Sequence, residues 1–518
     1  MFMKRAIWLL VLVFALGVAV GCGPADDPDD PVAPDEPSEL VIAQGTDVHG
    51  WDIHDRNHTA TEAVHINVFD YLVYRDDAGD IDPGLAYDWE ILDDTTWRFY
   101  LEEGVQFHNG DEFTAHDVKW TLERVAHSDG ELIEFGSYRQ IKEVVVVDDY
   151  TVDIITHDPQ PVLLNRLSRL GSGMLPSSYI EEIGWDGFAN DPVGTGPYRV
   201  VEWVRDDRVV MEAFDDHWRG RPDIDRVIHR AIPEDSTRVS ELITGGVDIA
   251  VNIPPEDWDR LEADDEIDLK IGLSNRVMLL EVRCQPEYVT SDPRVREAID
   301  YAIDNQLIID SLLGGAAVPT RWRVTPGNFG YHPDYWDVYN YDPDRARELL
   351  ADAGYPDGVE IDLHGPIGRY LKDTEVLEMI GGMLEAVGFD VNLQLMEWSA
   401  YIDMRNAYEH GDAMLIGYGN SLFDAALPVG SLHMDHTVGS QRYGYVNEEV
   451  SALIDQAEVE MDRETRRDLY HQIIELLAED RPQIALFKLP NAYGIREGVE
   501  FEPRLDEMLP FTQIELTR

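Results

Sequence analysis

With 518 residues the chain is too long for one compact core, so we expect two lobes, with room for a smaller sub-domain. Its hydrophobic fraction of 44% is that of an ordinary globular protein. The 102 Asp and Glu residues outnumber 41 Lys and Arg residues and leave a formal net charge of −61. This charge argues against nucleic acid as a partner, because phosphate binding needs a basic surface.

Arginine carries nearly all of the positive charge, since only six of the 41 cationic residues are lysine. A strongly acidic composition with so little lysine resembles that of proteins that work in concentrated salt. There the Debye length shortens to about 3 Å at 1 M, and repulsion between surface charges is tolerated. We interpret the charge as an adaptation to habitat and not as a ligand site.

Residues 1–21 read as an export signal, because Lys4 and Arg5 precede a short apolar run. Cys22 follows directly and is similar to the cysteine of a bacterial lipobox, which is lipidated on its sulfur after the signal is cleaved. Ala19 stands where the lipobox usually has Leu, and an uncleaved signal anchor is the alternative. Either outcome predicts an extracytoplasmic protein held on the membrane, in a periplasm or at a cell surface.

A tether follows the signal, because residues 22–39 combine prolines and acidic residues with almost nothing to bury. We expect this stretch to be extended and to hold the folded body off the membrane. The only other cysteine is Cys284, so a lipidated Cys22 would leave no internal disulfide.

From residue 40 onward short strand patterns alternate with helical ones, which predicts a mixed α/β protein. A strand at 40–43 opens the folded part. The alternating residues 97–101 predict a half-buried strand, whereas the continuous apolar run at 144–147 predicts a fully buried one. The spacing of apolar residues predicts a late helix near 466–479.

Several predicted helices carry recognisable ends. Thr114 and Asp117 form a capping-box pattern. Asp292 and Asp342 each precede a proline, which places a cap residue ahead of proline at the first helical position. Gly354 is a left-handed stop for the helix that begins after Asp342.

Three sequence blocks occur in a distinctive order. They are PGLAYDWE at 83–90 leading to GVQFHNGDEFTAHDV at 104–118, then DPVGTGPY at 191–198, and then PRVREAI at 293–299. Together they resemble family 5 of the bacterial extracellular solute-binding proteins, the dipeptide, oligopeptide and nickel binders. Asp191 replaces the Asn that the family usually has at the start of the second block.

The resemblance implies an α/β, two-lobed periplasmic-binding-protein-like fold of type II, cluster C, with an extra sub-domain in the first lobe. Lobe I would span 40–275, with the sub-domain inserted at about 65–190. Lobe II would span 276–484, and 485–518 would return to lobe I. The solute would be enclosed in a cleft between the lobes.

By the same resemblance the protein is a substrate-binding lipoprotein of an ABC importer, a monomer that delivers an oligopeptide-like solute to permease and ATPase subunits. It would be neither an enzyme nor a cofactor binder. An oligosaccharide or a metal chelate as the solute, a sensor role, and a glycoside hydrolase with a carboxylate pair are the alternatives. The chain lacks the hydrolase and nucleotide-loop motifs that would favour an enzyme.

In peptide binders of this family, a carboxylate of the second lobe pairs with the free amino end of the peptide. The matching stretch is 417–424, in which Asn420 stands about where that acid would be. Asp424, one helical turn further on, could replace it, and a cap or turn role fits Asp424 equally well.

Aromatic side chains suit such clefts because they present large rigid faces to varied ligands. The candidates are Trp51, Trp322, Trp398, Tyr418 and Phe423, each of which also fits a plain core or surface role. Arg321 and Arg323 flank Trp322 and could hold a carboxylate bidentately, or pair with a neighbouring acid.

Histidines raise the possibility of a metal ligand. His49, His54, His58 and His65 crowd one stretch, and residues 433–436 form an H-x-x-H pattern. The alternative is that each ring is solvated or hydrogen-bonded singly. We predict no metal site.

Overall fold

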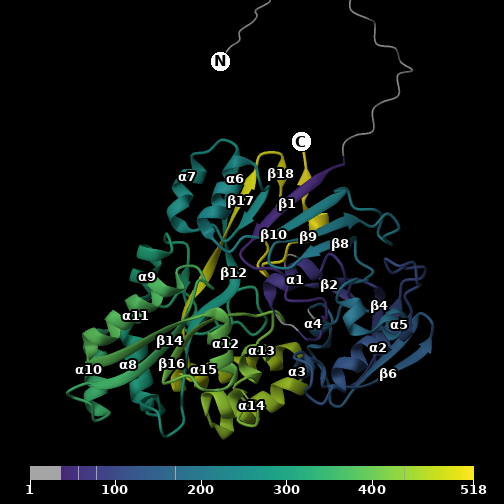
Figure 1. Cartoon of the computed structure of the whole chain (residues 1–518). Helices are drawn as coiled ribbons and strands as arrows, with labels where there is room; N and C mark the ends of the chain where they lie inside the picture. The colour runs from purple at the N-terminus through teal and green to yellow at the C-terminus, as the bar shows by residue number, and fades with distance from the viewer. Residues whose placement is uncertain (1–36, 56–57, 77–78, 170, 437, 518) are drawn as a thin grey trace, which may run out of the picture. The chain divides into compact units, whose positions relative to one another are not determined.

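A mixed sheet of 11 strands runs through the folded part of the chain (Figure 1). The computed structural model describes residues 37–55, 58–76, 79–169, 171–436 and 438–517. In sheet order the strands are β15 (Phe389–Glu397), β14 (Val359–Ile367), β16 (Ala413–Gly419), β12 (Ile267–Val282), β17 (Gln483–Arg496), β11 (Ile249–Val251), β1 (Glu39–Gln44), β10 (Arg226–Ala231), β9 (Arg208–Ala213) and β8 (Tyr198–Val204), with β13 (Val318–Pro319) beside β17. The predicted export signal, Cys22 and nearly all of the predicted tether lie outside these ranges.

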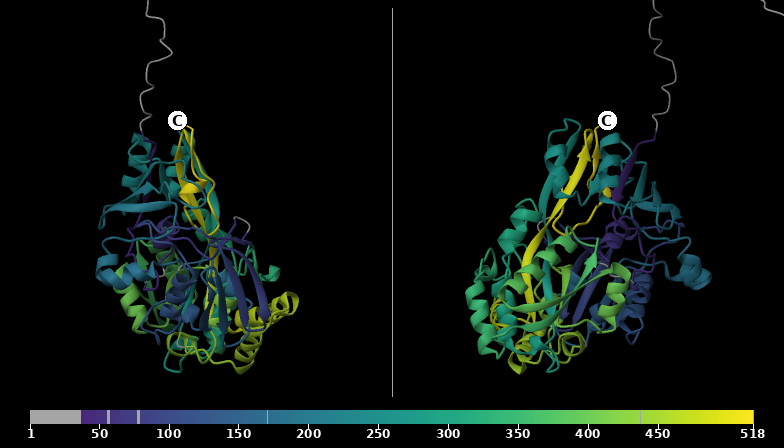
Figure 2. Two further views of the ribbon diagram at one scale, coloured as in Figure 1. Left: turned by 90° about the vertical axis from the view of Figure 1, so that its right-hand side faces the viewer. Right: turned by 60° about the vertical axis from the view of Figure 1, so that its left-hand side comes forward.

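Two long antiparallel strands, β12 and β17, occupy the middle of this sheet. Residues 267–273 of β12 pair with 490–496 of β17, and residues 277–281 pair with 483–488, with an irregular register between the two blocks. Figure 2 shows β17 as one long yellow strand in both views. Since the two ends of the pair contribute to different hydrophobic cores, the pair connects separately packed parts of the fold.

The first core surrounds β1 and a second, four-stranded sheet, and includes Leu40, Phe69, Phe99 and Val118. The four-stranded sheet has the order β4 (Ala86–Asp93), β5 (Thr96–Leu101), β7 (Thr151–Thr156) and β6 (Ile141–Asp148). The other elements of this region are α1 (Thr59–His65), β2 (Val73–Arg75), β3 (Ile81–Pro83), α2 (Ala115–Ala126), α3 (Phe135–Tyr138), α4 (Leu163–Arg166) and α5 (Ser177–Phe188).

The strand predictions in this region had different outcomes. Residues 97–101 form most of β5, with Trp97, Phe99 and Leu101 buried in alternation, which confirms the half-buried strand. The prediction of a fully buried strand at 144–147 is wrong in its burial: β6 forms there, but Val147 is 46% exposed. The reason is that β6 is an edge strand and packs against α2 on one face.

Helices of the second half of the chain build two further cores. The second core includes Leu279, Ile299, Leu363 and Leu384 and packs α8 (Pro293–Ala302), α9 (Asn305–Leu312), α10 (Pro343–Asp352) and α11 (Asp373–Val387) with β14, β15 and β16. The third core, around Trp322 and Ile473, contains α13 (Ala426–Gly430), α14 (Glu448–Val459) and α15 (Arg463–Asp480).

The remaining elements are short, apart from α6 (Asp235–Thr244) and α12 (Trp398–Asn406). A fourth core, around Leu242 and Trp258, packs α6 and α7 (Trp258–Glu262) near one end of β12. The others are the 3-10 turns Pro255–Asp257, Val289–Ser291, Pro333–Tyr335 and Phe511–Gln513, the π-helical turn Val438–Tyr443, and the strands β18 (Val499–Glu500) and β19 (Glu515–Leu516). Among the helices in the described ranges, none has the length and apolar character needed to cross a bilayer.

The predicted helix ends are confirmed. Thr114 and Asp117 form the reciprocal capping box of α2. Asp292 accepts a hydrogen bond from the backbone N of Arg294 at 2.9 Å and caps α8, while Asp342 caps α10 in the same way. Gly354 follows α10 with φ of 100°, a conformation that favours glycine.

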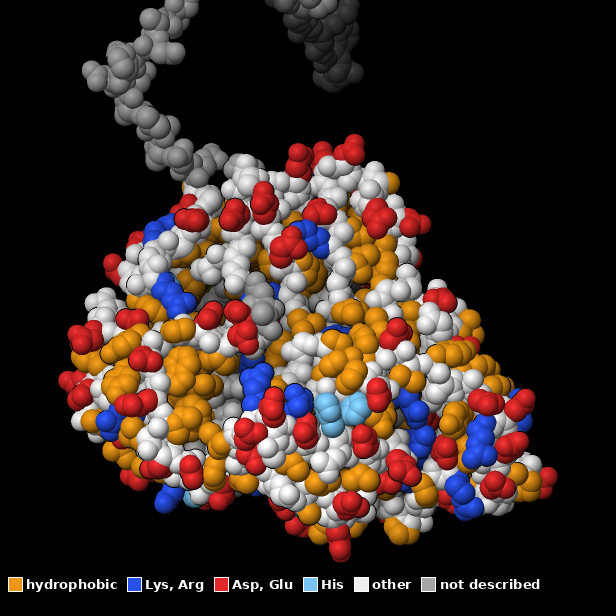
Figure 3. Space-filling model, turned by 180° about the vertical axis from the view of Figure 1, so that it is seen from behind, with side chains coloured by type: hydrophobic (Ala, Val, Ile, Leu, Met, Phe, Trp, Pro, Cys, Tyr) orange, Lys and Arg blue, Asp and Glu red, His pale blue; other side chains and the backbone are white. Residues whose placement is uncertain are grey.

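Acidic side chains are spread over the surface and not gathered in one patch, as Figure 3 shows for one face. Because like charges repel over the whole surface, we predict that the melting temperature rises by roughly 10 °C between about 0.2 M and about 2 M KCl. Thermal unfolding followed by circular dichroism measures this melting temperature, and sucrose serves as a control solute that does not screen charge. An unchanged or lower melting temperature in high salt would contradict this interpretation of the charge.

Candidate functional site

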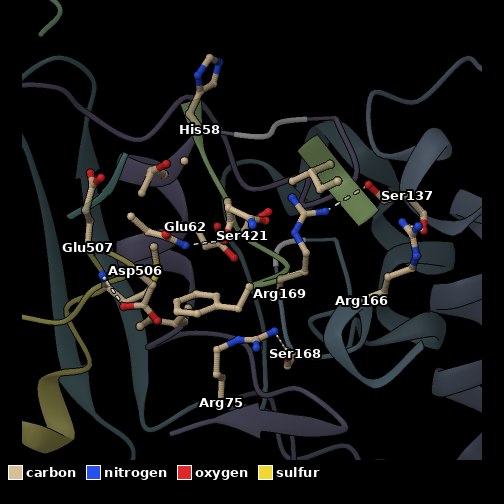
Figure 4. A pocket seen from close by; sticks show the side chains of 18 of the residues that line it. His58, Glu62, Arg75, Ser137, Arg166, Ser168, Arg169, Ser421, Asp506 and Glu507 are labelled. Atoms are coloured by element: carbon tan, nitrogen blue, oxygen red, sulfur yellow. Dashed lines mark hydrogen bonds between the residues drawn. The ribbon is translucent and has the colours of Figure 1, made fainter. Parts of the chain in front are cut away.

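A cavity of about 1690 Å³ lies within the folded part of the chain. Its walls come from α1 and the segment after it, from α3 and α4, from the end of β16 with α12 and α13, and from residues 504–515. Asn275 and Arg276, in the irregular middle of β12, also line it. Segments that precede β12 and segments that follow it therefore meet around one space, part of which Figure 4 shows.

The cavity differs in charge from the rest of the protein. Twelve arginines line it against ten Asp and Glu residues, and no lysine does, so the lining carries a formal excess of two positive charges. The arginines are Arg75, Arg139, Arg166, Arg169, Arg219, Arg221, Arg276, Arg323, Arg369, Arg405, Arg442 and Arg504. In a chain of net charge −61, this is a local reversal of sign.

Several of these arginines form ion pairs with carboxylates of the protein. The shortest N to O distances are 2.9 Å for Arg169 with Glu134, 3.3 Å for Arg276 with Glu507, 3.0 Å for Arg405 with Glu281, 2.8 Å for Arg504 with Asp506, and 2.5 Å for Arg221 with Asp225. Their positive charge is already balanced, and they hold the walls of the cavity together.

Seven arginines of the lining have no carboxylate within ion-pair distance among the residues that the structure describes, namely Arg75, Arg139, Arg166, Arg219, Arg323, Arg369 and Arg442. Burial lowers the pKa of Arg75 to about 10 and also lowers the pKa of Arg166 and of Arg369. The largest cause of each shift is the loss of water around the guanidinium, which the attraction of nearby carboxylates only partly offsets.

Neutral partners hold these guanidiniums in place. Arg75 donates from Nη2 to Ser168 Oγ at 3.0 Å and lies 4.6 Å from the centre of the Phe423 ring. Arg166 donates to the carbonyl of Ser137 at 2.8 Å. Carbonyl, hydroxyl and ring contacts orient a guanidinium and leave its charge unbalanced.

The same pattern occurs on the wall formed by the second half of the chain. Arg323 donates to the carbonyl of Pro428 at 2.8 Å and lies 4.4 Å from the centre of the Tyr418 ring. Arg369 lies 5.2 Å from the centre of the Trp398 ring.

A buried network around Glu281 fixes Tyr418 in the cavity wall. Glu281 is fully buried and accepts hydrogen bonds from Arg405, Tyr418 and Tyr443. Burial alone would raise the pKa of Glu281, but the attraction of Arg405 and Arg442 and these hydrogen bonds outweigh it and hold the pKa well below its usual range. The network joins β12, β16 and α12.

The structure places four of the eight predicted ligand residues in the cavity lining, namely Trp398, Tyr418, Asn420 and Phe423. Arg323, which flanks Trp322, also lines it. Asn420 donates to the carbonyl of Asp424 at 3.1 Å, and its side-chain oxygen has no hydrogen-bond partner among the described residues.

The other four predicted ligand residues lie outside the cavity lining. Trp51 and Trp322 are each 1% exposed and belong to the first and third cores. Arg321 pairs with Asp300 at 2.7 Å, and Asp424 is 1% exposed and pairs with Arg466 at 2.9 Å. Because Asp424 already has a cationic partner and also accepts from the backbone N of Ala426, it has the turn role and not the position of a ligand acid.

The histidines do not converge on one point. His54 contacts the carbonyl of Gly171 at 3.0 Å, and His65 contacts that of Gly50 at 2.8 Å. Burial lowers the pKa of His54 to about 3 and that of His65 to about 4, so both rings are neutral. His49 and His58 line the cavity. Across the described ranges, no group of three His, Cys, Asp or Glu side chains is placed to hold a metal ion.

Comparison with known proteins gives the family. The model of the bacterial extracellular solute-binding proteins, family 5 Middle, matches residues 80–432. The chain belongs to this family. Glutathione-binding protein GsiB of Salmonella paratyphi A is 28% identical over 470 residues, which cover 88% of this chain and 90% of that protein.

Solved structures give the fold. The binding protein DppA from Helicobacter pylori, in complex with the peptide STSA, has a TM-score of 0.83 at 25% identity and covers 93% of this chain and 98% of its own. AgaA from A. tumefaciens, in complex with agropinic acid, has a TM-score of 0.82 at 24% identity, covering 93% and 99%. These neighbours are two-lobed binding proteins of mixed α/β content, which confirms the predicted fold class and the resemblance stated above.

The buried network gives a stability prediction. Glu281→Gln leaves the charge of Arg405 buried without its partner, and we expect a loss of about 3–5 kcal/mol in the free energy of unfolding at neutral pH. Since the folded-state pKa of Glu281 is depressed, its contribution is complete above the unfolded pKa of about 4.3 and is lost as the pH falls below it.

Urea unfolding in constant high salt, followed from neutral to acidic pH, tests this prediction. The exposed Glu385→Gln on α11 is the control and should resemble the unchanged protein. The difference between Glu281→Gln and the unchanged protein should shrink as the pH falls. A difference below about 1 kcal/mol at neutral pH would mean that the ion pair of Glu281 with Arg405 contributes no more to the free energy of unfolding than an exposed ion pair does.

Proposed function

We propose that the protein is the substrate-binding component of an ABC importer and captures a peptide-like solute of a few residues in the cavity. The family is one of solute-binding proteins, and its relatives include a glutathione-binding protein and a structure with a bound tetrapeptide. The observation that carries the proposal is the size and composition of the cavity. At about 1690 Å³ it exceeds the range of roughly 300–1,000 Å³ that is usual for small-molecule sites.

Capture in this proposal depends on two lobes that close around the solute. Residues 40–275 would form the first lobe, with the sub-domain at about 65–190, and residues 276–484 the second, before 485–518 return to the first. The pairing of β12 with β17 would be the connection about which they move, because its irregular middle lies beside the cavity. Closure would remove the solute from water and strengthen each polar contact.

The proposed contacts are the lining residues Trp398, Tyr418, Asn420 and Phe423, together with four of the seven arginines that lack an ion-paired carboxylate among the described residues, namely Arg75, Arg166, Arg323 and Arg369. The solute would be released to a permease chemically unchanged. We propose no catalytic residue, cofactor or metal. The lipidated Cys22 would keep the monomeric protein on the outer side of the cytoplasmic membrane, near the permease.

Peptide binding should stabilise the folded protein. In about 2 M KCl, a peptide of three to five residues at 100 times its Kd should add about 2.7 kcal/mol to the free energy of unfolding. Thermal melts measure this, and Trp398→Ala should reduce it. Mass spectrometry of the recovered peptide serves as the control for chemical change. Stabilisation by oligosaccharides alone, or a hydrolysed peptide, would contradict the proposal.

Membrane attachment should depend on the first cysteine. Cys22→Ala should release the protein from the membrane fraction or leave its signal uncleaved, because no sulfur remains to carry the lipid. Cys284→Ala is the matched control and should stay membrane-bound. Immunoblots of membrane and soluble fractions give the readout, with the mass of the N-terminal peptide. Lipid-bearing protein from the Cys22→Ala variant would contradict the assignment.

A further inference from the structure

Four of the seven lining arginines that lack an ion-paired carboxylate among the described residues come from both halves of the chain. Arg75 and Arg166, in β2 and α4, form what we call the first arginine pair, and Figure 4 shows both among the lining side chains. Arg323 and Arg369, from the second half of the chain, form the second arginine pair. Positive charge without an ion-paired carboxylate therefore reaches the cavity from two different parts of the fold.

Each pair is buried enough for the missing counter-charge to matter. Arg323 is 7% exposed, and Nε of both Arg166 and Arg323 has no hydrogen-bond partner among the described residues. A guanidinium with open donors and little water is a ready partner for a carboxylate, which it can bind through two parallel N–H to O bonds. The ring contacts of Arg75, Arg323 and Arg369 hold those donors in place before any ligand arrives.

Two of the acids that act on these arginines are already engaged in ion pairs. Asp424 is close enough to act on Arg75 and Arg166, but its carboxylate pairs with Arg466 at 2.9 Å. Glu507, which acts on Arg369, pairs with Arg276. The protein itself therefore leaves room for further negative charge in the cavity.

Several of the lining carboxylates that could receive a cationic ligand are engaged in a similar way. In the cavity lining, Glu134 pairs with Arg169, Asp506 pairs with Arg504, and Asp70 accepts hydrogen bonds from Tyr74 and Trp218. Asn420 presents an uncharged side-chain oxygen that has no hydrogen-bond partner among the described residues. The lining therefore keeps its formal excess of two positive charges, which favours a solute of net negative charge.

We propose that the solute carries at least two carboxylates, one bound by an arginine of the first pair and another by an arginine of the second. This inference rests on the proposed function as a solute-binding protein, and it narrows the solute class to short acidic peptides and related polycarboxylates. A neutral solute would leave these guanidiniums, of which Arg323 is buried and Arg75, Arg166 and Arg369 are half-buried, without an ion-paired carboxylate. A cationic solute would add to the repulsion among them.

Matched probes separate the charge of a solute from its shape. Glu-Ala-Glu and Gln-Ala-Gln differ in two side-chain carboxylates at nearly equal volume, Lys-Ala-Lys reverses the charge, and tricarballylate supplies three carboxylates without a peptide. Titration calorimetry in buffered KCl gives each Kd. We expect Glu-Ala-Glu to bind at least about tenfold more tightly than Gln-Ala-Gln, and Lys-Ala-Lys to bind most weakly.

Two variants link this preference to the arginines. Arg75→Gln and Arg369→Gln should each weaken binding of Glu-Ala-Glu about tenfold or more and leave that of Gln-Ala-Gln within about twofold. Arg345→Gln on the exposed face of α10 is the control and should change neither. Each variant is first compared with the unchanged protein in a thermal melt. If one does not fold, the other variant and the peptide series still decide the question.

The outcomes distinguish this inference from the proposed function. Equal binding of the Glu and Gln peptides would overturn the carboxylate requirement and leave peptide capture standing. Binding of tricarballylate without either peptide would support the arginine pairs and overturn the peptide assignment. Failure of every probe would overturn both.

Discussion

The antiparallel pairing of β12 with β17 is the constraint on which the rest of the structure depends. One block of the pair packs with the first and fourth cores, and the other block packs with the second. The register is irregular between the blocks, and Asn275 and Arg276 line the cavity at that point. Arg276 pairs with Glu507 there and donates to the carbonyl of Gly417, so the strand itself ties the C-terminal segment to β16. The cavity walls are thereby held next to one another although they come from distant parts of the sequence.

Two electrostatic regimes coexist in this protein. Surface acids repel one another through water, and salt screens that repulsion within a few ångströms. The cavity arginines are shielded from water by aromatic rings and the surrounding walls, so salt screens them much less. An acidic surface that suits high salt is therefore compatible with a cavity whose lining carries an excess of positive charge. The buried carboxylate of Glu281 differs from these arginines, because it forms an ion pair with Arg405. Seven arginines of the cavity lining have no such partner among the described residues.

A structural feature could be predicted from the sequence when it depends on residues close together in the chain. Helix caps were predictable because Asp292, Asp342 and Thr114 act on backbone groups within a few residues. The burial of β6 was not predictable, because an apolar run does not reveal that its strand lies at the edge of a sheet. For Asp424 the decisive partner is Arg466, 42 residues away, and nothing near Asp424 in the sequence announces it.

The candidate contact residues also differ in whether the sequence could predict them. Tyr418, Asn420 and Phe423 could be proposed because one stretch of the chain resembles the ligand-contacting segment of a family. Arg75, Arg166 and Arg369 come from three unrelated segments, and only folding brings them to one cavity. An arginine in an acidic protein is expected to pair with an acid, so its lack of a partner is visible only in three dimensions.

Mass spectrometry of the solute that the protein carries when it is isolated gently from its own cells tests the central claim most directly. The protein is denatured, the released small molecules are separated, and their carboxyl groups are counted by esterification. Our account requires a small, chemically intact molecule with two or more carboxylates. A neutral oligosaccharide or a cationic peptide as the main solute would contradict it.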